Sequence, residues 1–267
     1  MKQTAWTLAC FIVVAAHAEG ADDRDPLAAA RLFYNQRDFV AAVAAADQAR
    51  LVPARADSAD LIAARAFLEQ YRESSTASDL VQARERLRRI TPDKFVVRER
   101  IEFLVGLGET LYFEGSFGAA ADVFDSVLRQ SGALKGEERD RVLDWWATAL
   151  DRDARPHADI DRQAIYQRIR DGMHVELGTT PASVTAMYWL AAAARGQGDL
   201  QGAWDAALAG WVRAPLAGLR GAALREDLDQ LVVTALVPER ARALGQPPNN
   251  IRQEWDRFRE RWSSDTP

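Results

Sequence analysis

The feature that most limits what this chain can fold into is a pair of amphipathic helices in residues 104–130. Apolar or small residues recur there at i, i+3, i+4 and i+7, the spacing of one helical face, at Leu104, Leu107, Gly108 and Leu111. Gly115 then supplies the left-handed backbone that ends a helix, and Ser116 is a good N-cap for the next one. Because such a pair leaves apolar surface on both flanks, it must stack on further pairs of its own kind.

The same pattern occurs three times in register, in residues 23–54, 101–132 and 184–215. The copies align on the expected caps of their second helices, which are Asp38, Ser116 and Asp199. In each copy the residue after the cap is large and apolar, and the fourth residue after the cap is alanine. Eight positions before each cap stands a small residue that lets the two helices approach closely: Ala30, Gly108 and Ala191.

Two weaker copies fill the gaps between these three. Residues 57–92 repeat the spacing with a longer turn and with Asp79 as the expected cap, and residues 137–178 repeat it more loosely around Pro156. No segment shows the alternation and turn signals of a sheet. The sequence therefore predicts an all-α fold with five stacked helix pairs over residues 25–213.

Beyond the third clear copy the pattern fades. Residues 217–236 predict one more helix, which Pro238 should end, and residues 239–244 predict a short helical piece. The Gly, Pro and Asn content of residues 245–250 indicates a linker. The last segment, 251–264, is expected to be an amphipathic helix that caps the stack, with an apolar side made of Ile251, Trp255, Phe258 and Trp262.

At these residues the chain resembles the tetratricopeptide repeat family, although Arg37 stands where that family usually has glycine. The resemblance implies a right-handed superhelical solenoid of antiparallel helix pairs, whose concave face is lined by first helices and binds a protein or peptide. Transferred by position, the partner-binding candidates are Arg31, Tyr34, Asn35, Glu109, Tyr112, Phe113, Tyr188 and Arg195. Further groove positions are Glu102, Val105, Thr185 and Ala192.

Two of these candidates are also favoured by the residues themselves. Tyr34 and Tyr112 lie off the packed stripe of their helices, and aromatic rings with a polar tip suit interfaces. The alternative for Tyr112 and Phe113 is that they pack on the neighbouring helix pair.

The N-terminus predicts export. Residues 1–18 have the layout of a signal peptide, with Lys2 at the start, an apolar core too short to span a bilayer, and a cleavage site that ends at Ala18. Cys10 is the only cysteine, so the mature chain would hold no disulfide or thiolate site. We therefore expect a repeat domain, residues 19–244, in the periplasm or outside the cell, with no integral membrane span after cleavage.

Little in the sequence points to catalysis, a cofactor or a metal. The formal net charge of −5 argues against a nucleic-acid partner. His157 lies among aspartates that fit no calcium-loop spacing, and His174 lacks the partners of a known zinc arrangement. The basic run at residues 84–89 is typical of a solvated helix face, with a docking surface for an acidic partner or an anionic envelope polymer as the alternative.

We therefore expect a non-catalytic scaffold or adaptor that binds a protein or peptide of the bacterial cell envelope. Two alternatives stay open: an accessory helical part of an enzyme system that acts on cell-wall glycan, and a small-ligand or lipid cradle lined by tryptophans. Five tryptophans are expected in the core, namely Trp145, Trp146, Trp189, Trp204 and Trp211. Those of the last helix should dock on the final repeat or offer an apolar ridge to another protein.

Overall fold

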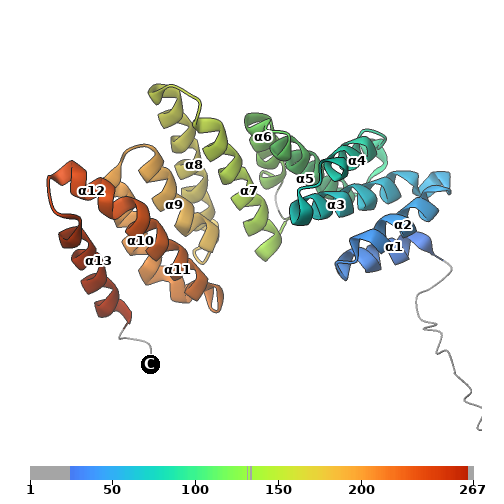
Figure 1. The fold of residues 1–267 in the computed structure, drawn as a ribbon. Coiled ribbons are helices and arrows are strands. Elements are labelled where there is room, and N and C mark those ends of the chain that lie inside the picture. The colour runs from blue at the N-terminus through green and yellow to red at the C-terminus, as the bar shows by residue number, and fades with distance from the viewer. Residues whose placement is uncertain (1–24, 131, 133, 264–267) are drawn as a thin grey trace, which may run out of the picture.

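The computed structural model describes residues 25–130, 132 and 134–263, and within them the regular structure is helical, with no strand. The expected signal peptide, residues 1–18, lies outside the described residues, as does the last position of the expected C-terminal helix. The first ten α-helices of the described chain form five consecutive pairs (Figure 1). The pairs are α1 (Pro26–Asn35) with α2 (Phe39–Arg50), α3 (Ala56–Ser74) with α4 (Ala77–Leu87), α5 (Val97–Phe113) with α6 (Phe117–Leu128), α7 (Gly136–Ala154) with α8 (Asp159–Thr179), and α9 (Val184–Gly196) with α10 (Leu200–Arg213). The predictions of an all-α fold and of stacked pairs are confirmed.

Neighbouring helices pack against one another in sequence order, and the pairs follow an arc from the blue to the red end of Figure 1. The first helices of successive pairs also touch, α1 with α3, α3 with α5, α5 with α7 and α7 with α9. Helix α11 (Arg220–Leu231) packs on α9 and so extends this row. One side of the stack is therefore built from first helices alone.

The turns inside the three clear copies share one geometry. Arg37, Gly115 and Gly198 have φ angles of 62°, 82° and 82°, and each donates its backbone N–H to the carbonyl three residues earlier. Arg37 therefore adopts the left-handed backbone that the other two copies assign to glycine, which is unusual for a residue with a Cβ. The tight turn does not depend on glycine at this position.

Three of the four expected caps stand at the N-cap position of their helices, and two of these make a capping hydrogen bond. The carboxylates of Asp38 and Asp199 accept hydrogen bonds from backbone N–H groups in the first turns of α2 and α10. Ser116 is at the N-cap of α6, but its hydroxyl makes no capping bond. The prediction that Asp79 caps α4 is wrong: Ser75 ends α3 in a left-handed conformation, α4 begins directly after Thr76, and Asp79 lies in its first turn.

The small residues that precede the caps are buried between paired helices, as predicted. Ala30 and Ala191 are fully buried, and Gly108 lies directly against the ring of Phe124.

Four of the five tryptophans expected in the core are buried, while Trp145 is only half-buried. Trp145 therefore lies at the edge of the core, where its ring can reach the surface of the stack.

Pro238 does not end a helix, which corrects the prediction for this segment. Helix α11 runs through a π-helical turn, Val232–Leu236, directly into α12 (Val237–Leu244), and Pro238 lies in the first turn of α12. The N–H of Val237 donates to the carbonyl of Val232, a wider i→i+5 bond. A wider turn accommodates the proline ring, which would clash with the carbonyl four residues earlier in a regular helix.

The C-terminal helix begins earlier than expected, because α13 spans Pro248–Ser263 and leaves only residues 245–247 as the connection. It packs on α10 and α12 and buries Trp255 completely, between the rings of Trp204 and Trp211. The indole N–H of Trp255 donates to Asp229 at 2.8 Å. Trp262, about two turns further along α13, stays 45% exposed. No helix among the described residues combines the length and apolar character needed to cross a bilayer.

Candidate functional site

Two adjoining cavities of about 100 and 640 Å³ open on the side of the stack that is built from first helices. Their lining comes from α1, α3, α5 and α7 and from the connections that precede α5 and α7, with nothing from α2, α4 or α6. We call the two cavities together the Arg–Glu hollow, because arginine and glutamate dominate its wall. Its charged residues are Arg31, Arg65, Arg72, Arg98, Arg141, Glu69, Glu99, Glu102, Glu109 and Glu138.

Helical spacing explains why these side chains share one surface. In α3, Arg65, Glu69 and Arg72 follow at i, i+4 and i+7, and in α7 Glu138, Arg141 and Trp145 follow at i, i+3 and i+7. Residues with these spacings lie on one face of a helix. Since the first helices stand side by side, their charged faces combine into one wall.

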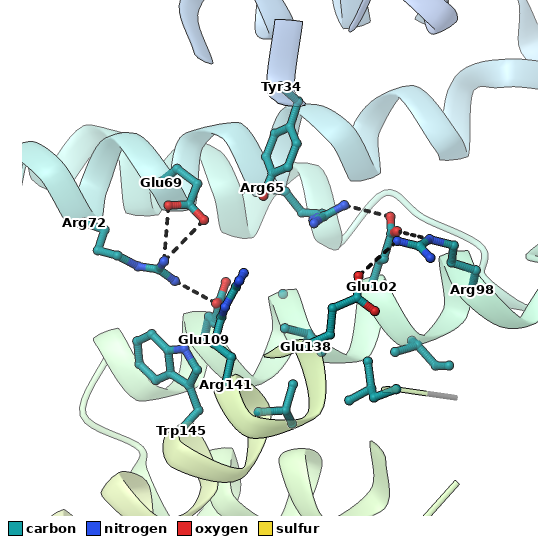
Figure 2. A pocket seen from close by; sticks show the side chains of 15 residues that line it. Tyr34, Arg65, Glu69, Arg72, Arg98, Glu102, Glu109, Glu138, Arg141 and Trp145 are labelled. Atoms are coloured by element: carbon teal, nitrogen blue, oxygen red, sulfur yellow. Dashed lines mark hydrogen bonds and ion pairs between the residues drawn. The ribbon is translucent and has the colours of Figure 1, made fainter. Parts of the chain in front are cut away.

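Ion pairs connect three consecutive first helices at one end of the hollow (Figure 2). Arg65 Nη1 in α3 donates to Glu102 Oε2 in α5 at 2.8 Å. The other oxygen of Glu102 accepts from Arg98 Nε at 3.1 Å, and Arg98 Nη2 reaches Glu138 in α7 at 3.2 Å. Because the Arg98 side chain is 73% exposed, its two pairs contribute little to stability and can rearrange when a partner binds.

A second bridge lies deeper. Arg72 Nη2 donates to Glu109 Oε1 at 2.8 Å, and Arg72 Nη1 contacts Glu69 Oε2 at 3.2 Å. The Glu109 side chain is only 11% exposed. Burial raises the pKa of Glu109 above its ordinary value, although the charge of Arg72 opposes this shift. The floor of the hollow therefore holds a buried carboxyl group that is paired with Arg72.

Two aromatic rings flank these charges, and each carries an arginine on its face. The guanidinium of Arg65 lies 4.5 Å from the ring centre of Tyr34, and that of Arg72 lies 5.2 Å from the ring centre of Trp145. Burial raises the pKa of the Tyr34 phenol, with the charge of Arg65 acting in the opposite direction. The hollow thus offers aromatic surface as well as charge.

Arg141 differs from the other arginines of the hollow. It lines both cavities and is exposed, yet it makes no hydrogen bond or ion pair with any other residue in the described part of the chain. Figure 2 shows its side chain among the sticks that line the cavity, without a dashed line to a neighbour. Its five N–H donors are therefore free to meet a ligand.

Four of the eight candidates from the sequence come together here. Tyr34 and Glu109 line the narrow cavity, and Arg31, Asn35 and Tyr34 line the wide one. Arg31 donates to Glu99 of α5 at 2.8 Å. The further groove positions Glu102 and Val105 also line the hollow.

The other four candidates lie elsewhere. Tyr112 and Phe113 belong to an aromatic cluster, in which their ring centres lie 4.9 and 5.6 Å from that of Trp145. They pack on the next helix pair, which was the alternative stated for them. Tyr188 is half-buried beside Trp189, and Arg195 forms a two-bond pair with Glu239 of α12, at 2.6 and 2.9 Å.

Several residues of the hollow were not predicted when the family's groove positions were transferred to this sequence. They belong to the weak copies or were assigned to the core. Arg65, Glu69 and Arg72 lie in α3, and Arg141 and Trp145 in α7, where the family spacing is loose. A usable signal was present, because charged residues at helical spacing on α3, α5 and α7 indicate a shared face. Their convergence, however, depends on how the pairs stack.

Within the described chain, no group of three or more His, Cys, Asp or Glu side chains is placed to hold a metal ion. The fold and the hollow together are compatible with one class of protein, the helical-repeat proteins, in which stacked helix pairs present an interaction surface. Comparisons with models of known families, with curated proteins and with solved structures give no match.

Proposed function

We propose that this chain is a tetratricopeptide-like scaffold, a right-handed superhelix that binds a protein or peptide segment along its concave face and catalyses no reaction itself. The observation that carries this proposal is that the Arg–Glu hollow is lined by the first helices of four consecutive pairs and by no second helix between them. A surface that extends over several repeats suits an extended chain better than a compact ligand.

The chemistry of the hollow supports a polypeptide partner. Arginine and aromatic side chains are enriched where proteins recognise one another, and Tyr34, Trp145 and Arg141 supply both kinds within one surface. The half-exposed ion pairs around Arg98 can exchange partners at low cost. A bound segment would gain hydrogen bonds without disturbing the packed core.

We place this activity in the cell envelope, on the strength of the signal-like layout of residues 1–18. N-terminal sequencing of the protein recovered from its native host is expected to start at Glu19. Recovery of a chain that still begins with Met1 would contradict export by this route.

Site-specific photo-crosslinking tests the binding face. A crosslinking amino acid is placed at Asn35 or Glu138 in the hollow, or at Val40 or Asp122, which are exposed on the second helices α2 and α6. We expect the two hollow positions to capture the same partner and the two outer positions to capture none of it. A matched Tyr34→Ala/Trp145→Ala variant should abolish that crosslink. Capture from the outer positions alone, or capture that survives the double variant, would contradict the proposal.

A further inference from the structure

The strongest unexplained feature of the hollow is Arg141, its one arginine without a partner among the residues that the structure describes. The charge pattern around Arg141 suggests what the hollow binds. This inference rests on the proposed function. We propose that the bound segment is an acidic peptide motif, in which an Asp or Glu carboxylate binds Arg141 and a neighbouring apolar side chain enters the narrow cavity beside Trp145.

Each glutamate of the hollow already accepts a hydrogen bond from an arginine other than Arg141. The pairs are Glu99 with Arg31, Glu102 with Arg65 and Arg98, Glu138 with Arg98, and Glu69 and Glu109 with Arg72. Arg141 is left over. The hollow therefore has one unused guanidinium and no unused carboxylate.

This imbalance discriminates between ligand charges. An incoming carboxylate can take two parallel hydrogen bonds from Arg141 without breaking an existing pair. An incoming ammonium or guanidinium group would have to displace an arginine from its glutamate. Glu109 already accepts a hydrogen bond from Arg72 at 2.8 Å, so its charge is offset before a second carboxylate arrives.

The apolar part of the motif follows from the narrow cavity. Val142 is the neighbour of Arg141 in the chain and Trp145 is one turn further along α7, and both line this cavity with Ile101, Val105 and Leu134. Its volume of about 100 Å³ lies well below the ~300–1,000 Å³ of pockets that bind whole small-molecule ligands. A single apolar side chain next to the carboxylate is the better fit.

The test uses the purified protein and a library of short random peptides displayed on phage. Peptides selected on the wild type are expected to share an Asp or Glu beside an aliphatic or aromatic residue. The Arg141→Gln variant should bind such a peptide about tenfold more weakly, the loss expected for one charge-assisted hydrogen-bonded pair. Arg129→Gln is the matched control: Arg129 is exposed at the C-cap of α6, outside the hollow, and pairs with Asp125, so binding should not change.

A double-mutant cycle makes the assignment specific. Replacing the peptide carboxylate by its amide should weaken binding to the wild type as much as Arg141→Gln does, and should add no further loss in the Arg141→Gln variant. Since Arg141 is exposed and unpaired, its replacement should leave the unfolding curve unchanged, which circular dichroism checks.

The outcomes separate this inference from the function on which it rests. Peptides that need Tyr34 and Trp145 but bind Arg141→Gln as tightly as the wild type would overturn the acidic motif and leave the binding face standing. Selection of basic motifs would likewise overturn the acidic motif and leave the binding face standing. Selected peptides that are all insensitive to the Tyr34→Ala/Trp145→Ala variant, or no selection at all, would overturn both.

Discussion

The ring of Phe124 in α6 lies directly against the backbone of Gly108 in α5, so that a Cβ on Gly108 would be 2.5 Å from Phe124 Cε1. Phe124 is fully buried, so its ring can move aside only by displacing other core side chains. The glycine is required by packing, since its helix would otherwise be more stable with alanine. This contact sets how closely the helices of the central pair approach.

The first prediction concerns this contact. Gly108→Ala should lower the free energy of unfolding by ~1–3 kcal/mol, because the added methyl overpacks a rigid site. Gly106→Ala, in the same helix, is the control: its nearest neighbour would be a Leu87 methyl at 3.5 Å, an ordinary contact. That variant should be neutral or more stable by up to ~1 kcal/mol. Urea unfolding followed by circular dichroism measures both, and equal effects would contradict the packing argument.

A second prediction compares two equivalent turns. Gly115→Ala should cost ~1–2 kcal/mol, because a Cβ is disfavoured at a φ of 82° although no heavy atom lies within 4 Å of it. Arg37→Ala at the matching position should change stability by less than ~0.5 kcal/mol, because Arg37 already carries this cost and its pair with Glu73 is exposed. Thermal unfolding of the two variants tests the comparison. A large loss for Arg37→Ala would show that the side chain itself holds the turn.

The third prediction is a pH dependence. The pKa of Glu109 is higher in the folded protein than its ordinary value of 4.5, so the folded state binds more protons than the unfolded state above that pH. The contribution of Glu109 to stability is therefore complete below pH 4.5 and declines as the pH rises through its folded pKa. In Glu109→Gln this decline should be absent. Urea midpoints measured from pH 4.5 to neutrality should give a flatter curve for the variant, and parallel curves would contradict the assignment.

The fourth prediction concerns the end of the stack. Trp255→Ala should release α13, because buried tryptophans contribute ~3–5 kcal/mol and its hydrogen bond to Asp229 is lost as well. Hydrogen exchange should show that amides of α13 lose protection while those of α5 keep it. Trp262→Ala changes a half-exposed ring of the same helix and should leave the amide protection of α13 and of α5 unchanged. Unfolding of the whole chain by Trp255→Ala would mean that α13 is part of the central core.

Sequence reasoning succeeded where the signal is local. The five pairs, the close contact at Gly108 and the left-handed turn at Gly115 all follow from spacing within a few residues. It failed at Asp79 and Pro238, where nearby backbone geometry takes a less common form that the residue type alone does not reveal. For the hollow, transfer by position named Tyr34 and Glu109, which line the narrow cavity; their role in binding stays a prediction.

The sequence by itself determined that this chain forms helix pairs and that the pairs must stack, because helical periodicity and turn residues act over short distances. Only the tertiary structure decided which charged side chains meet. Arg65 pairs with Glu102 and Arg72 with Glu109, each across 37 positions, and Arg141 is left without a partner among the described residues. The sequence does not reveal on which side of the stack an exposed charged residue lies. These side chains share one hollow because the first helices stack against one another.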